Sequence, residues 1–166
     1  DRALDHTDQL TADLEDEQIS WRASEEASGI GWHLGHQAAV AHFMLRNLTA
    51  AEPSLDPAFD ALMDSATPAR HRGDLPPRSH IVDFRNDVAD RVRHRVGRIA
   101  AGDVGAPLQL RQIGVGLMVA MINHEYQHSK WIGELRTGVH GLDLPPAVTS
   151  PFISEIEGYY VVGAAL

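Results

Sequence analysis

Apolar residues recur at three- and four-residue steps in three long stretches of the chain, and this spacing places side chains on one face of an α-helix. The first stretch covers residues 29–48, and the longest runs over residues 108–136, where Gly138 ends the pattern. Between them, residues 79–102 show the same spacing, with Ser79 in the position of an N-cap. The pattern therefore predicts three amphipathic helices.

The remaining segments carry weaker signals. Residues 4–14 place leucines among polar neighbours and predict a short helix, whereas residues 15–28 are acidic and rich in serine and predict a loop. Prolines interrupt the connection that follows the first long helix, and we expect it to be irregular, with one helical turn at 58–63. Near the end of the chain, YYVVG at 159–163 predicts a short strand or a tail that docks on the core.

Four helices with a long connection between the second and the third predict an all-α protein, a four-helix bundle of antiparallel helices. The length of 166 residues is that of one domain with a core of its own. We expect residues 1–166 to form this single domain, with residues 141–166 as a C-terminal extension whose structure the pattern leaves open.

Composition and charge exclude several classes of function. The chain has no cysteine, which excludes disulfides, iron–sulfur clusters and a cysteine nucleophile. Its formal net charge of −9 disfavours binding to nucleic acid and to anionic membranes. No apolar run is long enough to span a membrane, and the first ten residues contain no apolar signal core. The first residue is not methionine, so we expect a trimmed start, and we expect a cytoplasmic protein.

Histidine is the unusual residue type, with 10 copies, two of which stand in HEYQH at 124–128. Histidines four residues apart lie on one helical face about one turn apart, so both imidazoles can reach one metal ion. The same face carries Met121 and Trp131, which directs His124 and His128 into the bundle. Two histidines in this arrangement favour a metal site over two hydrogen-bonded core residues.

HEYQH also satisfies the HExxH pattern of zinc peptidases, in which the glutamate is the general base. Glu125 would have that catalytic role here. It lies about 100° around the helix from His124, so a solvated surface position is the alternative, and we favour it slightly. The extended peptidase pattern fails, because Trp131 and Glu134 occupy the positions of its glycine and third histidine.

A third imidazole comes from WHLGH at 32–36. One face of the predicted helix carries Trp32, His36, Val40 and Phe43. We therefore expect His36 to face the core and His33 to lie at the edge of this face. With both histidines of HEYQH, His36 completes a three-histidine site with open coordination positions. Imidazole ligands suit Zn, Ni, Fe or Cu. We interpret the other histidines as surface or structural residues: His6, His42, His71, His80, His94 and His140.

These motifs, in this order and separation, resemble the DinB-like superfamily. The residues that carry the resemblance are ISWR at 19–22, GIGWHLGH at 29–36, HEYQH at 124–128 and GELR at 133–136. The resemblance covers roughly residues 1–140 and is closest to a branch of thiol-dependent transferases found in actinobacteria.

The resemblance implies a four-helix bundle in which His36, His124 and His128 hold a divalent metal such as Zn, Ni or Fe. Enzymes of this branch bind a low-molecular-weight thiol such as mycothiol or bacillithiol, whose sulfur is activated as a metal-bound thiolate. They transfer it to an electrophile or isomerise an adduct. The partners would then be a small-molecule thiol and an electrophile. The absence of cysteine agrees with this, because the cofactor would supply the nucleophilic sulfur.

Some residues depart from the family pattern. Many members carry HRGQ or HxGH after the last ligand, whereas this chain has SKW at 129–131, and Lys130 stands where iron-dependent sulfoxide synthases have a glutamate. Trp32 and Trp131 are candidates for lining a substrate pocket, with a place in the core as the alternative. A rival function is a non-catalytic module that holds metal or a hydrophobic ligand, or serves as the scaffold of a homodimer.

Overall fold

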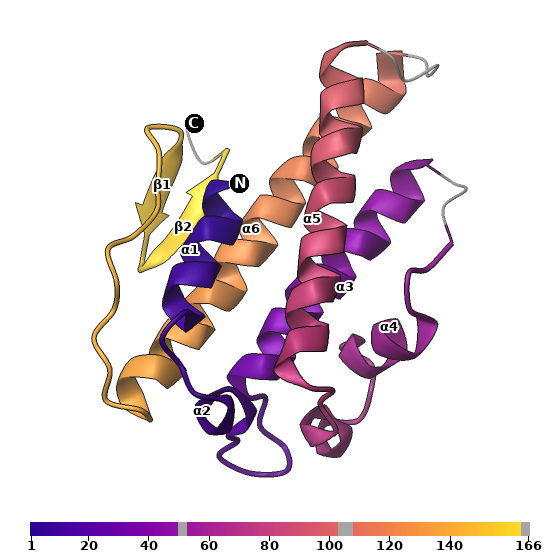
Figure 1. The fold of residues 1–166 in the computed structure, drawn as a ribbon. Helices are drawn as coiled ribbons and strands as arrows, with labels where there is room; N and C mark the ends of the chain where they lie inside the picture. Colours follow the sequence, from indigo (N-terminus) through magenta and orange to yellow (C-terminus); the bar gives the residue numbers. More distant parts are fainter. Residues whose placement is uncertain (50–52, 103–107, 164–166) are drawn as a thin grey trace.

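Four helices form the body of the molecule (Figure 1). They are α1 (Arg2–Thr11), α3 (Ile30–Thr49), α5 (Arg78–Ala100) and α6 (Leu108–Gly138). α3 packs against both α5 and α6, and α1 packs against α6. The computed structural model describes residues 1–49, 53–102 and 108–163, and within these ranges the chain is mostly helical, which confirms the all-α class. None of the helices described there combines the length and apolar character needed to cross a membrane.

α3 and α5 run in the same direction, as the colours of Figure 1 show, so the expectation of antiparallel helices is wrong for this pair. The connection between them returns the chain to the end of the molecule at which α3 began. This connection contains α4 (Pro57–Met63) and a 3₁₀ helix (Ala69–Gly73). The helical turn predicted at 58–63 is thereby confirmed, whereas the 3₁₀ helix had no signal in the apolar pattern.

A short helix, α2 (Asp16–Ser20), lies in the segment expected to be a loop. Its start is fixed locally by a capping box, in which the side chain of Glu15 accepts from the backbone of Gln18 and the side chain of Gln18 accepts from the backbone of Glu15. These reciprocal hydrogen bonds satisfy amide groups that the first turn of any helix leaves without partners. Polar residues therefore stabilise α2 in a segment whose apolar pattern does not predict a helix.

The start of α5 also differs from the prediction. Pro77 is the N-cap residue, so Ser79 lies inside the first turn and has no capping role. The guanidinium of Arg78 donates to the carbonyl oxygens of Thr11 (2.9 Å) and Leu14 (2.6 Å). α1 ends at Thr11, three residues before the end that the pattern predicts. Arg78 therefore donates to the carbonyl of the last residue of α1 and to the carbonyl of Leu14 in the segment that follows. The start of α5 is thus tied to the end of α1.

The apolar core is centred where α3 meets α4 and α5. Its members include Leu34, Ala38, Phe59, Ile81, Phe84 and Val88. Arg85 of α5 is only 6% exposed, although it carries a charge. Its guanidinium donates to Glu125 Oε1 (3.1 Å), Asp8 Oδ1 (3.3 Å) and the Leu34 carbonyl (3.3 Å). Because a buried charge is stable only when it is paired and hydrogen-bonded, these partners explain how Arg85 enters the core.

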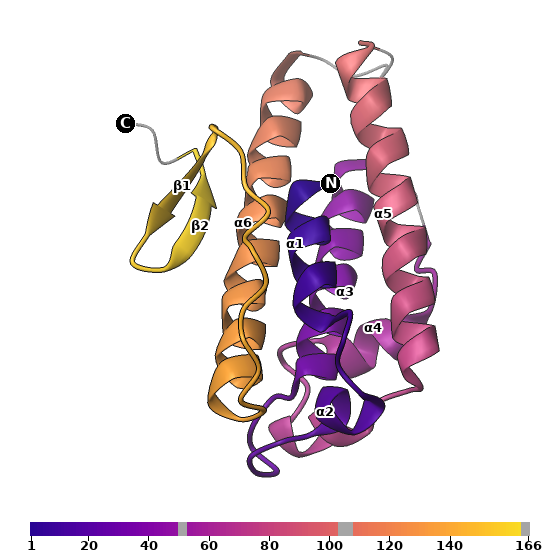
Figure 2. The same ribbon diagram turned by 60° about the vertical axis from the view of Figure 1, so that its left-hand side comes forward.

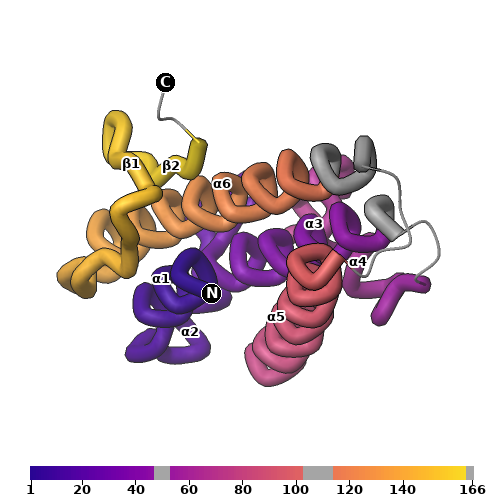
Figure 3. Tube along the Cα trace, turned by 90° about the horizontal axis from the view of Figure 1, so that it is seen from above, coloured from indigo at the N-terminus to yellow at the C-terminus, as the bar shows by residue number. Residues whose placement is uncertain are grey.

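The C-terminal extension runs back along α6 and ends in a β-hairpin on the side of α6 away from α5 (Figures 2 and 3). The hairpin pairs β1 (Ile153–Ile156) with β2 (Tyr159–Val162) in antiparallel register, and β2 confirms the predicted strand. Asn123 on α6 exchanges two hydrogen bonds with the backbone of Val162 (2.7 and 3.1 Å). The hydroxyl of Tyr126 donates to the carbonyl of Val148 (2.8 Å), so side chains of α6 hold the extension at two levels.

Candidate metal centre

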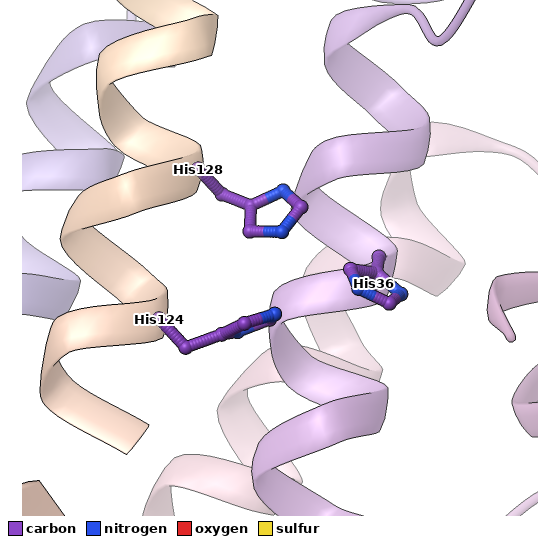
Figure 4. A group of neighbouring side chains, drawn as sticks. All are labelled: His36, His124 and His128. Atoms are coloured by element: carbon purple, nitrogen blue, oxygen red, sulfur yellow. The ribbon is translucent and has the colours of Figure 1, made fainter. Parts of the chain in front are cut away.

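Three imidazoles converge between α3 and α6 (Figure 4). His124 and His128 lie one turn apart on α6, and His36 faces them from α3. One ring nitrogen from each residue can be chosen so that the three atoms all lie within 4.8 Å of one another. His36 and His128 are buried, and His124 is half-buried. The structure thus brings together the three histidines that the sequence singled out.

A backbone carbonyl orients the ring of His36. Nδ1 of His36 lies 2.6 Å from the carbonyl oxygen of Met63, the last residue of α4, and must donate because a carbonyl only accepts. A neutral imidazole has one N–H, so this bond leaves the Nε2 lone pair of His36 free to bind a metal. Trp32 stacks on the same ring, with centroids 4.5 Å apart and planes inclined by 11°.

His33, expected at the edge of the core-facing side of the helix, is buried and supports His128. It is 8% exposed, and its Nδ1 lies 2.8 Å from Nδ1 of His128. When His128 donates in this bond, its Nε2 is free for a metal, and His33 accepts. Trp131 meets the ring of His128 edge-on at a centroid distance of 4.7 Å and lies 5.7 Å from the ring of His33.

The environment favours neutral imidazoles, which is the form that binds metals. Burial lowers the pKa of His124 to about 4, assisted by His36. Burial also lowers the pKa of His128 to about 2, assisted by the other histidines. His33 has its pKa lowered to about 4 by burial, and Arg72, whose guanidinium lies 4.3 Å from the centre of the Trp32 ring, contributes to this. Protons therefore do not compete for these nitrogens near neutral pH.

The residues fit a divalent metal bound by three imidazoles. The lowered pKa values favour neutral imidazoles, the Met63 carbonyl fixes the tautomer of His36, and one nitrogen from each ring lies within 4.8 Å of the other two. Three protein ligands leave coordination positions open, which is the pattern of catalytic rather than structural zinc sites. The donor set alone does not select among Zn, Ni and Fe.

One concave surface borders the cluster, and a second lies beside the residues that pack on His128. A groove of about 580 Å³ includes His36 in its wall and is lined mainly by apolar side chains, among them Val40, Phe43, Met44 and Leu117. A shallower depression of about 430 Å³ lies beside His33 and Trp131. Phe43 is 61% exposed, so the expectation that its helical face points into the core is wrong at this end. α5 packs on another face of α3, around Leu34 and Ala38, and leaves Phe43 at the groove.

Glu125 belongs to a different environment from its neighbour His124. It is 6% exposed, so the interpretation as a solvated residue is wrong. Its Oε1 accepts from the hydroxyl of Thr7 on α1 (2.7 Å) and from Arg85 on α5 (3.1 Å). On balance, the carboxylates of Glu125 and Asp8 raise the pKa of Arg85 against the opposing effect of burial. Glu125 is thus engaged in an ion pair with α5, whereas His124 faces α3.

The two tryptophans proposed to line a pocket have different surroundings. Trp32 is 4% exposed and packed between the ring of His36 and the guanidinium of Arg72, which leaves little surface for a ligand. Trp131 is half-buried and lines the depression beside His33. Trp131 is therefore the one that a bound molecule can reach.

Sequence reasoning missed three contributors to the site and its surroundings. Met63 contributes its backbone carbonyl, and the type of a residue gives no information about where its carbonyl lies. Arg72 follows from the 3₁₀ helix that the pattern did not predict. Arg85 carries a charge whose partner lies 40 residues away in the chain. Among the other histidines, His42 is fully buried, with Nδ1 3.8 Å from Asp60 Oδ1, which agrees with a structural role.

Fold and site together define a helical protein with a candidate three-histidine metal centre. A family model of the DinB superfamily matches residues 1–132, from α1 to beyond the last of the three histidines, and the chain belongs to this superfamily. A search of curated proteins finds no match to the chain.

Proposed function

We propose that this protein is a divalent-metal-dependent enzyme that transfers or isomerises the adduct of a low-molecular-weight thiol. The observation that carries the proposal is the convergence of three neutral imidazoles from α3 and α6 beside an open groove. A bound metal would supply a Lewis acid that lowers the pKa of a thiol. His36, His124 and His128 would hold it, and Met63 and His33 would orient two of these rings.

The surroundings suit two small substrates rather than a peptide. The groove has His36 in its wall and the depression is lined by His33 and Trp131, so one surface would take a thiol and the other an electrophile. Apolar walls such as Phe43 and Leu117 would bury the apolar part of an electrophile. The chain has no cysteine of its own, so its chemistry with sulfur requires a thiol from outside.

The ion pair of Glu125 argues against the peptidase alternative. A general base in an HExxH site must reach the water that the metal activates. Glu125 instead accepts from Thr7 and Arg85, which belong to helices other than α3. We therefore assign Glu125 a structural role in the proposed enzyme.

The test begins with metal content. Purified protein is loaded separately with Zn²⁺, Ni²⁺ and Fe²⁺, and the bound metal is measured by elemental analysis. Thiol consumption is then followed with a panel of low-molecular-weight thiols and small electrophiles, mycothiol and bacillithiol included. We expect one metal per chain and turnover that His36→Ala, His124→Ala and His128→Ala abolish.

His71→Ala is the matched control, because His71 is exposed and pairs with Asp74 on the 3₁₀-helix segment. It should retain both metal and turnover. Metal binding without turnover on the whole panel would favour the non-catalytic module. Metal-dependent peptide cleavage that Glu125→Gln abolishes would overturn the proposal in favour of a peptidase.

A further inference from the structure

The side chain of Met63, the last residue of α4, packs directly against Gly35 of α3. A Cβ atom added to Gly35 would lie 2.5 Å from Sδ and 2.6 Å from Cε of Met63, well inside van der Waals contact. Met63 is 0% exposed and its side chain borders the groove at His36, so a Cβ at position 35 would displace the end of this side chain. The absence of a side chain at position 35 is therefore what lets the Met63 side chain pack in its present place against α3.

The backbone of the same residue forms a hydrogen bond with His36. Met63 is the last residue of α4, and carbonyls at the end of a helix have no partner within it. The carbonyl of Met63 accepts from Nδ1 of His36 at 2.6 Å. This acceptor also lies at the negative end of the α4 dipole, which favours a donor there.

α4 is anchored at several points, so its last carbonyl has a defined position. Asp56 caps its start by accepting from the amides of Ala58 and Phe59, at 3.0 Å each. The ring of Phe59 packs on Phe84 of α5 with centroids 4.3 Å apart. Asp60 accepts from Arg46 of α3 at 3.4 Å. These contacts hold α4 to both helices that it crosses.

We propose that α4 is a positioning element for His36: Gly35 admits the end of α4, and the Met63 carbonyl then fixes the Nδ1–H tautomer and the ring plane of His36. The role of α4 at a metal centre rests on the proposed function, whereas its effect on the tautomer of His36 does not. Groups that orient a metal-binding histidine in this way typically change metal affinity about 10- to 100-fold when they are lost.

The test uses Gly35→Ala, with Gly116→Ala as the matched control. Gly116 also lies in a helix, but an added Cβ there meets nothing within 4 Å. The tautomer of His36 is read in the metal-free protein from the ¹⁵N chemical shifts of its ring. Affinity for Zn²⁺ is measured by competition with a chelator, and the visible spectrum of Co²⁺-loaded protein reports the ligand geometry.

We expect the Nδ1–H tautomer in the wild type and in Gly116→Ala, and a mixture of tautomers in Gly35→Ala. We also expect Gly35→Ala to weaken Zn²⁺ binding about 10- to 100-fold and to alter the Co²⁺ spectrum. An Nε2–H tautomer in the wild type overturns the inference even if Gly35→Ala does not fold. An unchanged tautomer and affinity in folded Gly35→Ala does the same.

Failure of the proposed function gives a different result. If the wild type binds neither Zn²⁺ nor Co²⁺, the metal centre is refuted, and the tautomer measurement decides the positioning claim alone. Met63→Ala provides a rescue experiment, because it keeps the backbone carbonyl and removes the atoms that a Cβ at position 35 would meet. If the contact between the added Cβ and the Met63 side chain causes the loss of the Nδ1–H tautomer, the Gly35→Ala/Met63→Ala variant should regain that tautomer. A folded double variant that does not regain it would contradict this explanation.

Discussion

At the scale of single residues, adjacent positions on α6 serve different parts of the molecule. His124 faces the other imidazoles, and Glu125 forms a buried ion pair with Arg85. The two histidines of HEYQH could be predicted because their relation is local and follows from helical spacing. The partners of Glu125 could not, because Thr7 and Arg85 come from distant segments and polar residues in a periodic pattern suggest a surface.

The Glu125→Gln substitution separates the two roles. It removes the buried partner of Arg85 and leaves only the exposed carboxylate of Asp8 to compensate its charge, which we expect to lower the free energy of unfolding by about 3 kcal/mol. Metal content should be unchanged, because the candidate metal ligands are the three clustered histidines and do not include Glu125. Urea unfolding and elemental analysis check both points. A stable variant that has lost metal-dependent turnover would instead identify Glu125 as a catalytic base.

His33→Ala tests the support that His128 receives. The substitution removes the Nδ1 that lies 2.8 Å from Nδ1 of His128, so we expect metal binding to weaken about tenfold. At saturating metal the protein should still bind one ion per chain, whereas His36→Ala should bind none. Chelator competition measures the affinities. If His33→Ala loses the metal and His36→Ala keeps it, the roles assigned to these two histidines are reversed.

At the scale of elements, the long helices were predictable and the short ones were not. α3 and α6 repeat apolar positions over many turns, and their observed bounds agree with the predicted ranges to within about two residues. α2 depends on a capping box, and the 3₁₀ helix lies among prolines and charged residues. Such elements are decided by individual hydrogen bonds and by the neighbours on which they pack, so periodicity carries little information about them.

The cap of α4 provides a prediction for this element. Asp56→Ala removes the acceptor of two amide hydrogen bonds, and we expect it to lower the free energy of unfolding by about 1 kcal/mol. Asp56→Asn keeps a capping oxygen and should lose much less. Amide hydrogen exchange should increase in α4 of Asp56→Ala and remain unchanged in α6. Equal exchange in α4 of both variants would show that packing, rather than the cap, holds this helix.

At the scale of the whole molecule, stability should depend on pH through buried histidines. The unfolded chain protonates histidine near its usual pKa of 6.5, whereas the lowered pKa of about 4 keeps His33 and His124 neutral in the folded protein. Between these values the unfolded state binds more protons, so stability is lost as the pH falls. Each such histidine contributes up to about 1.4 kcal/mol per pH unit.

Urea unfolding of the metal-free protein at about pH 7.5, 6.5 and 5.5 measures this dependence, and the loss should be steepest below the histidine pKa of the unfolded chain. Zn²⁺ should stabilise the protein at all three pH values, because the lowered pKa values of His124 (about 4) and His128 (about 2) keep both imidazoles neutral in the folded protein throughout this interval. Constant stability over this interval would contradict the lowered pKa values of His33 and His124.

The candidate site also has a place in the order of folding events. His33 and His128 meet across a separation of 95 residues, so the site requires α3 and α6 to be paired, and we expect it to form after the transition state for folding. Contacts between distant segments that form late affect the unfolding rate and leave the folding rate nearly unchanged. A metal bound by this cluster should therefore lengthen the lifetime of the native state without accelerating refolding. The ion would thus provide kinetic stability to the assembled protein rather than nucleate the folding of the helices.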